Sequence, residues 1–339
     1  MQLKILLPII GIASFLLTVV FSRIAIPKLR SMKMGQKILD IGPRWHKNKE
    51  GTPTMGGVVF LLAAILVAGG VSAYLLLCES ASLSALLPFW ALILFAVVSG
   101  LIGMIDDSVK ITKKRNEGLT PLQKSFLQTL SAAAFLLVLR LLGEINTVLY
   151  VPFFHWSIDL GVFYYILAMF MIVGMVNSVN LTDGIDGLAS GEMLVVSLFL
   201  AGMSATQGLV LPGAAAAMGA GLAAGFLVYN FYPARVFMGD TGSLFFGGVL
   251  IGCGFLLGNP LLVFVCGIMF VVETASVILQ TTYFKITRRL SGTGKRIFKM
   301  SPIHHHFEMC GWSEVKIVTV FCLINLIFSA ASFLLEYIL

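Results

Sequence analysis

Charged residues are scarce in this sequence. They account for 12% of its 339 residues, whereas 58% are hydrophobic. Soluble domains carry about a quarter charged residues, so the composition excludes an ordinary soluble domain and predicts a polytopic membrane protein. Most of its core should then consist of helices packed against helices in lipid.

Cysteine is also rare. The five cysteines are scattered along the chain and include no CxxC pair, which argues against a disulfide framework and against a zinc site. A cleavable signal peptide is not expected either. The first apolar segment, about 3–26, is too long and is followed by no small-residue cleavage site, so we expect it to remain as a span.

Long apolar runs are abundant instead. Runs of about 17–25 residues are candidates for transmembrane helices, and lipid offers no partners to an open backbone. We therefore predict an all-α fold with about ten spans in a single domain, 1–339. The predicted spans are 3–26, 55–77, 87–105, 121–142, 161–179, 189–206, 213–232, 242–258, 261–284 and 315–338.

The basic residues predict the orientation. Of the 23 Lys and Arg, all but Lys4 and Arg140 lie on one side of the ten alternating spans. Because cytoplasmic loops are enriched in basic residues, we expect that side to be cytoplasmic and both termini to lie outside. This also accounts for the net charge of +7 without nucleic acid. The predicted cytoplasmic segments are 27–54, 106–120, 180–188, 233–241 and 285–314.

Local patterns predict a few further details. Thr120, Pro121 and Gln123 have the spacing of a capping box with proline at the first helical position. Among the outward segments, only 143–160 is long, and we expect a small hairpin or an interfacial turn there. GxxxG spacing, which suits close helix contact, occurs at glycines 221/225, 248/252 and 254/258.

Acidic residues gather on the predicted cytoplasmic side. A carboxylate near mid-bilayer costs about 2.5–3.5 kcal/mol on insertion scales, so such residues usually mark a working site. Taken alone, each of these acidic residues is consistent with an ordinary charge at a helix end. However, three loops that are distant in the sequence each contain at least one of these acidic residues. Mg²⁺ is commonly held by one or two carboxylates plus substrate phosphates, and other acids would orient or deprotonate a nucleophile. The residues are Asp106, Asp107, Asp183, Asp186 and Asp240.

Two of these loops also contain glycine. In NLTDGIDG (180–187) glycines alternate with acids, which lets the backbone approach a ligand closely. The spacing is not that of an EF-hand. In FMGDTGS (237–243) Asp240 lies near a predicted helix N-terminus, which favours anionic groups. The Walker pattern GxxxxGK[ST] is missing.

Basic and histidine residues complete the pattern. Lys110 lies one helical turn from Asp106 and could face the same site, while Lys113 to Arg115 fit an ordinary cytoplasmic flank. Three consecutive histidines in SPIHHHFE (301–308) cannot all face one metal from a helix. Their imidazoles could instead contact phosphate or sugar oxygens. Glu273, inside the ninth predicted span, has no assigned role.

Taken together, these segments resemble the phospho-N-acetylmuramoyl-pentapeptide transferase family, within the polyprenyl-phosphate N-acetylhexosamine-1-phosphate transferase superfamily. The resemblance extends over nearly the whole chain, and the histidine triplet points to this family within the superfamily. The matching motifs are GTPTMGG (51–57), IDD (105–107), NLTDGIDGL (180–188), VFMGDTGS (236–243) and GKRIFKMSPIHHHFE (294–308).

The resemblance implies an activity and a location. UDP-MurNAc-pentapeptide would react with undecaprenyl phosphate at the cytoplasmic face of the bacterial inner membrane, giving lipid I and UMP with Mg²⁺. Asp240 would be the Mg²⁺ ligand, and Asp106 or Asp107 would prepare the lipid phosphate, by direct attack or through a covalent aspartyl intermediate. The family also implies a homodimer and a lipid groove near the ninth span.

The resemblance extends to further site residues. His304 would act with the catalytic aspartates, and Phe237 would stack on the uracil. The remaining substrate-binding candidates are Lys49, Thr54, Lys110, Lys124, Asn180, Asp183, Asp186, Asn230 and His305.

Two alternatives remain open at this point. A related transferase would use a UDP-N-acetylhexosamine with another polyprenyl phosphate, but it should lack the HHHFE and GTPTMGG motifs. A secondary transporter would need acids near mid-bilayer, often at an inverted-repeat interface. Here the acids lie along one face, and no repeat is evident in the sequence.

Overall fold

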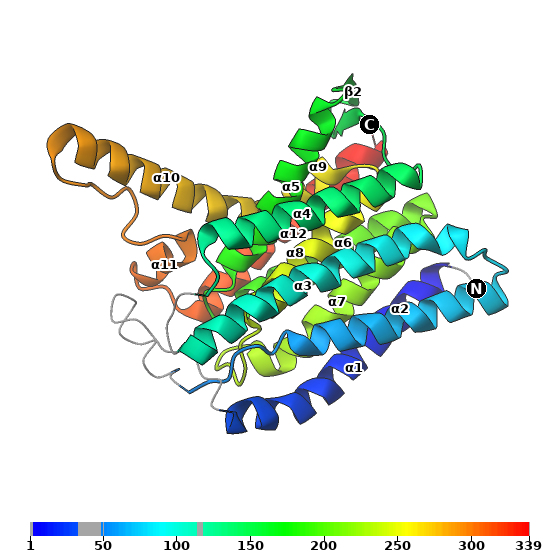
Figure 1. Ribbon diagram of the computed structural model, residues 1–339, viewed down its shortest axis with the longest axis horizontal. Helices are drawn as coiled ribbons and strands as arrows, with labels where there is room; N and C mark the ends of the chain where they lie inside the picture. The colour runs from blue at the N-terminus through cyan, green and yellow to red at the C-terminus, as the bar shows by residue number, and fades with distance from the viewer. Residues whose placement is uncertain (1–2, 33–48, 50, 114–117, 339) are drawn as a thin grey trace.

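The computed structural model describes residues 3–32, 49, 51–113 and 118–338. Within them the fold is an all-α bundle (Figure 1), and nine helices are long and apolar enough to cross a membrane. The prediction of an all-α polytopic membrane protein is confirmed, while the single-domain assignment stays a prediction. The predicted segments 27–54 and 106–120 lie partly outside the described residues, which exclude Lys114 and Arg115.

The nine helices follow the predicted spans closely. The third runs beyond its predicted end at 105, so that it carries both aspartates of the IDD motif and Lys110. The helices are α1 Leu3–Ser31, α2 Val58–Cys78, α3 Leu87–Lys113, α4 Pro121–Leu141, α5 Phe163–Thr182, α6 Leu188–Gln207, α7 Val210–Asn230, α8 Gly239–Leu256 and α12 Glu314–Ile338.

The ninth predicted span, 261–284, is not one straight helix. It consists of α9 (Pro260–Cys266) and α10 (Ile268–Ser291), which meet at Gly267 with a bend of 82°. Asn325 of α12 accepts a hydrogen bond from the Met269 N–H at 3.0 Å, and Ser329 donates to the Cys266 carbonyl at 3.3 Å. A broken helix is tolerated at membrane depth when neighbours satisfy its backbone in this way. Figure 1 shows α10 projecting away from the bundle.

Glycines allow the central helices to approach closely. Gly248 and Gly252 of α8 lie against Ala96 and Leu92 of α3. Similarly, Gly221 and Gly225 of α7 face the backbone of α1. Two of the three GxxxG patterns therefore mark helix–helix contacts as predicted. In the third, Gly254 faces α9, while Gly258 adopts φ +71° just beyond the end of α8 and has no close neighbour.

The shorter predicted elements are also present. Thr120 and Gln123 form the capping box at the start of α4. The segment 143–160, predicted to lie outside, contains an antiparallel hairpin of β1 (Val148–Val151) and β2 (Trp156–Asp159). The remaining elements are the short helices η2 (Ser84–Leu86) and α11 (Ile303–Glu308), the latter containing the histidine triplet.

Candidate active site

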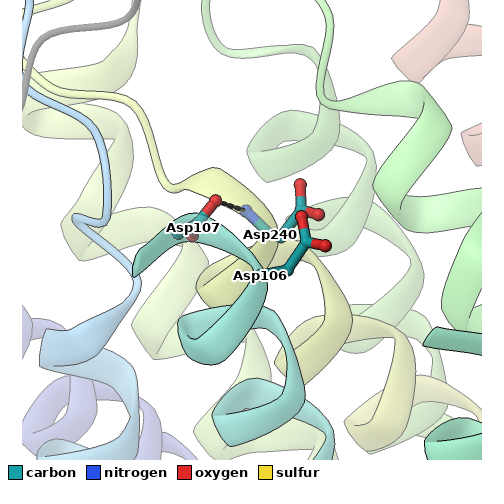
Figure 2. A group of neighbouring side chains, drawn as sticks. All are labelled: Asp106, Asp107 and Asp240. Carbon is teal, nitrogen blue, oxygen red and sulfur yellow. Dashed lines mark hydrogen bonds between the residues drawn. The ribbon is translucent and has the colours of Figure 1, made fainter. Parts of the chain in front are cut away.

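Three aspartates from two helix ends form the centre of the site. Asp106 and Asp107 lie near the C-terminal end of α3, and Asp240 lies in the first turn of α8. One carboxylate oxygen of each lies within 4.8 Å of the others (Figure 2). Gly103 makes this approach possible, because a Cβ at that position would overlap the backbone of Asp240.

Asp107 caps the N-terminus of α8 from the neighbouring helix. Its Oδ1 accepts a hydrogen bond from the Asp240 N–H at 3.2 Å, the contact drawn in Figure 2. Its Oδ2 accepts from the Thr241 N–H at 3.0 Å and from the Thr241 hydroxyl at 2.8 Å. A helix N-terminus leaves its first N–H groups without intrahelical partners, and Met238 at the N-cap position supplies no side-chain acceptor. Both oxygens of Asp107 are thus engaged in holding α8.

Asp106 has a different environment from its neighbour. It lines a cavity of about 700 Å³, together with Lys110, Lys124, Asn180 and Asp240. Its Oδ2 lies 2.6 Å from the Lys110 Nζ, one helical turn away as predicted. Of the two adjacent aspartates, Asp106 is therefore the one that faces the cavity.

Two lysines and an asparagine surround Asp240. Its Oδ2 lies 2.7 Å from the Lys124 Nζ and 3.1 Å from the Lys110 Nζ. Asn180, near the end of α5, donates to Oδ1 at 3.0 Å and accepts from Lys124 at 3.1 Å. The structure thus brings three other predicted site residues together around the carboxylate of Asp240.

This group of residues fits a divalent cation. The three carboxyl groups of Asp106, Asp107 and Asp240 lie beside only two basic groups, those of Lys110 and Lys124, so the cluster has more acids than bases. The three carboxylates offer oxygen, the ligand atom that Mg²⁺ prefers. Asp240 and Asp106 line the cavity, whereas Asp107 does not and is bonded to the backbone of α8. Asp240 and Asp106 are therefore the better candidates for ligands.

A second charged cluster joins three distant parts of the chain. The Lys49 Nζ lies 2.7 Å from Asp186 Oδ1 and 2.6 Å from Glu314 Oε2. Asp186 also accepts a hydrogen bond from the Ala234 N–H at 2.8 Å. Lys49 and Asp186, both predicted site residues, are thus in contact. They are not among the residues that line the 700 Å³ cavity.

Asp183 lies between the two clusters. It keeps some contact with solvent, but its carboxyl forms no hydrogen bond or ion pair with any described residue. Burial, followed by the negative charges of Asp240 and the acids beside it, raises the pKa of Asp183 to about 8. A cationic or hydrogen-bonding partner would favour its ionised form.

The three histidines point in different directions. His304 is fully buried and lies against Gly184, and its Nδ1 is 3.0 Å from Glu273. His305 Nδ1 is 2.6 Å from Glu308, and His306 Nδ1 accepts a hydrogen bond from the Lys299 N–H. No common metal site is formed by the triplet in the described structure. His304 contacts the loop 183–187 between α5 and α6, here called the Asp-Gly loop, rather than the cavity.

The remaining predicted residues support loops around the site. Asn230 is buried, accepts from Ser190 and donates to the Val236 carbonyl, both at 3.0 Å. The backbone of Phe237 pairs with the segment 53–56. Thr54 lies beside Gly239, close to Asp107. These contacts hold the GTPTMGG segment against the start of α8.

Two buried acids were missed by sequence reasoning. Glu314 lies in the first turn of α12, where an acidic residue is common at the start of a helix. The sequence therefore gives no signal for its contact with Lys49. Glu192 is fully buried in α6 and accepts a hydrogen bond from Asn325 at 3.1 Å. An acid inside an apolar run is itself a signal, and this one could have been recognised.

Comparison with known proteins places the chain in a family. The family model described as Glycosyl transferase family 4 matches residues 89–258, from α3 to α8, and the phospho-N-acetylmuramoyl-pentapeptide-transferase signature 1 matches residues 49–61. An all-α membrane bundle with clustered carboxylates and lysines at its helix ends is thus a membrane-embedded member of this transferase class.

Full-length relatives define the family more narrowly. Three proteins named phospho-N-acetylmuramoyl-pentapeptide-transferase resemble the chain along nearly its whole length. The relative from Geobacillus kaustophilus is 43% identical over 95% of each chain. That from Oceanobacillus iheyensis is 42% identical over 96% of each, and that from Staphylococcus carnosus is 41% identical over 94% of this chain and 96% of its own. This chain belongs to the phospho-N-acetylmuramoyl-pentapeptide-transferase family.

The different surroundings of the adjacent aspartates predict different stabilities. Asp107→Ala leaves two backbone N–H groups and a hydroxyl of α8 without their acceptor, which should cost about 1–3 kcal/mol of unfolding free energy. Thermal unfolding of the purified protein in detergent measures the loss. Asp106→Ala is the matched control and should shift the midpoint less, because Asp106 accepts only one backbone hydrogen bond, from Leu119. Equal shifts for the two variants would contradict the assigned capping role.

Proposed function

We propose that the protein transfers phospho-MurNAc-pentapeptide from UDP-MurNAc-pentapeptide to undecaprenyl phosphate, giving lipid I and UMP, in the first membrane step of peptidoglycan synthesis. One substrate is soluble and anionic, whereas the other is embedded in lipid. A site at the ends of membrane helices can receive both. The observation that carries the proposal is the grouping of Asp106, Asp240, Lys110 and Lys124 around one cavity.

The residues that line the cavity are proposed to have different roles in phosphate transfer. Lys110 and Lys124 bind phosphate oxygens and offset charge on the pyrophosphate. Asp106, the aspartate that faces the cavity, orients the undecaprenyl phosphate and accepts its proton. Asp107 keeps α8, and with it Asp240, in a fixed position relative to Asp106. Lys110, 2.6 Å from Asp106, would hold this carboxyl group in position beside the cavity.

Asp240 is proposed as the Mg²⁺ ligand, with Asp106 beside it. When bound there, Mg²⁺ would supply Lewis acidity that stabilises negative charge on the pyrophosphate and on the UMP leaving group. Asn180, which donates to Asp240 at 3.0 Å, fixes the orientation of that carboxylate. Such support of a metal ligand by a hydrogen-bonding neighbour is usual.

The Asp-Gly loop and its neighbours are proposed to bind the nucleotide-sugar half of the donor. Phe237 stacks on the base, and Asn180, Asp183 and Asp186 supply polar contacts. His305, on α11, would contact sugar or phosphate oxygens. His304, which is fully buried against Gly184, would support this loop. Lys49, Thr54 and Asn230 complete the set.

The site is proposed to face the cytoplasm of a bacterial cell, in the inner membrane. The basic residues near it support this orientation, because cytoplasmic loops carry the excess of Lys and Arg. In Figure 1 the hairpin and the end of α12 lie at the opposite end of the bundle from α11, as expected for termini outside.

A homodimer is also proposed. An apolar groove of about 590 Å³ lies among α1, α6 and α7, lined by residues such as Phe15, Leu198 and Ala217. A second copy of the chain would cover this apolar surface, in which Lys4 is the one charged lining residue. The mass of the protein in nanodiscs tests this, and we expect two copies per particle. Single copies at every protein concentration would remove the dimer from the proposal.

Turnover with defined substrates tests the proposed function. With Mg²⁺ and a polyprenyl phosphate, the purified protein should release UMP from UDP-MurNAc-pentapeptide at least about a hundredfold faster than from UDP-GlcNAc. The reason is that the site would bind groups of UDP-MurNAc-pentapeptide that UDP-GlcNAc lacks. Chelation of Mg²⁺ should stop release. Equal rates with both donors would favour the related N-acetylhexosamine transferase.

The Asp240→Asn variant is the accompanying control for the site. Loss of the proposed ligand should lower turnover by about a hundredfold or more, while the unfolding temperature stays near that of the wild type. Full turnover by this variant would remove Asp240 from the reaction.

Two native cysteines test the orientation. Cys78, at the end of α2, and Cys310, beyond α11, are both exposed and lie on opposite sides of the predicted topology. An impermeant maleimide added to intact cells should label Cys78 and leave Cys310 unlabelled until the membrane is opened. The single variants Cys78→Ser and Cys310→Ser assign each signal. The reverse pattern would invert the proposed topology.

A further inference from the structure

Lys49 is bracketed by two buried carboxylates from separate parts of the chain. Asp186 belongs to the Asp-Gly loop and Glu314 to the first turn of α12, and each lies within 2.7 Å of the Lys49 Nζ. Their side chains are 2% and 8% exposed, against 16% for Lys49. The cluster therefore contains two negative charges and one positive charge with little access to water.

Glu314 also holds the backbone of the Asp-Gly loop. The same Oε2 that contacts Lys49 accepts a hydrogen bond from the Asp186 N–H at 2.9 Å. The two oxygens of Asp186 are already engaged, one by Lys49 and the other by the Ala234 N–H. One oxygen of Glu314 thus fixes the position of both Lys49 and the main chain at Asp186.

The charge balance keeps Lys49 in place. If the ammonium left, two buried carboxylates would face each other without a cation, which is strongly unfavourable. An ammonium group has three N–H donors, and Asp186 and Glu314 use two of them. Lys49 can therefore present its third donor to a substrate while it remains bound to both acids.

We propose that Glu314 is a positioning residue for the transfer reaction. It holds the Lys49 ammonium and the backbone at Asp186 in the arrangement that receives the donor substrate, and it does not itself touch the substrate. This inference rests on the proposed function, in which Lys49 and Asp186 bind the donor.

Steady-state kinetics with each substrate varied in turn tests the role. Glu314→Ala should raise the KM for UDP-MurNAc-pentapeptide by about tenfold, with kcat within about threefold and the KM for undecaprenyl phosphate unchanged. Glu314→Gln should restore much of the donor KM, because its amide oxygen can still accept both hydrogen bonds. Lys316→Ala, which alters an exposed charge in the same turn of α12, is the matched control and should behave as the wild type.

A double-variant cycle shows whether Glu314 acts through Lys49. When Lys49 is already replaced by Ala, the further change Glu314→Ala should raise the donor KM by clearly less than about tenfold, because coupled residues are not additive. The remaining effect would come from the hydrogen bond between Glu314 and the backbone at Asp186. Fully additive effects, or equal changes in both KM values, would overturn the inference. The inference would also be overturned if the wild type is active and both Glu314 variants have the same KM and kcat as the wild type. Absence of UMP release by the wild type would instead defeat the proposed function, and this inference with it.

Discussion

The contact between Asp107 and the N-terminus of α8 fixes the geometry of the whole site. A helix that begins at the membrane boundary presents unpaired N–H groups, and here the acceptor comes from α3 rather than from the preceding loop. Gly103 permits the approach, since any side chain there would meet the Asp240 backbone. Because this contact sets α3 against α8, it also sets the spacing between Asp106 and Asp240.

Charge is distributed over two clusters on either side of the Asp-Gly loop. Around the cavity, Lys110 and Lys124 share the carboxylate of Asp240. On the other side, Lys49 alone is shared by two acids. Both clusters carry more carboxylates than cations, and Asp183 lies between them without a described partner. The loop thus joins the part of the site proposed to hold phosphate and metal to the part proposed to hold the rest of the donor.

Sequence patterns predicted the elements of the fold better than the roles of single residues. Hydropathy placed the nine long helices, because lipid selects for uninterrupted apolar runs. The bend at Gly267 was not predicted, since the apolar composition continues through it and the compensating side chains lie on α12.

Within the site, the acidic motifs identified residues that do converge, but their neighbours in space remained hidden. Asp106 and Asp107 are adjacent in sequence and equal in chemistry. Only the helix on which they lie and the position of α8 distinguish the one that faces the cavity from the one that caps a helix. The partnership of Lys49 with Glu314 spans 265 residues, and no local pattern encodes a contact of that kind.

The side chains that satisfy the backbone at Gly267 make α12 a specific component of the bundle. By hydropathy alone, α12 would be interchangeable with any apolar helix of its length. Asn325, however, accepts from the Met269 N–H and donates to Glu192, and Ser329 donates to the Cys266 carbonyl. An apolar replacement of Asn325 or Ser329 would lower the free energy of unfolding, because the lost hydrogen bonds could not be replaced by the surrounding hydrocarbon.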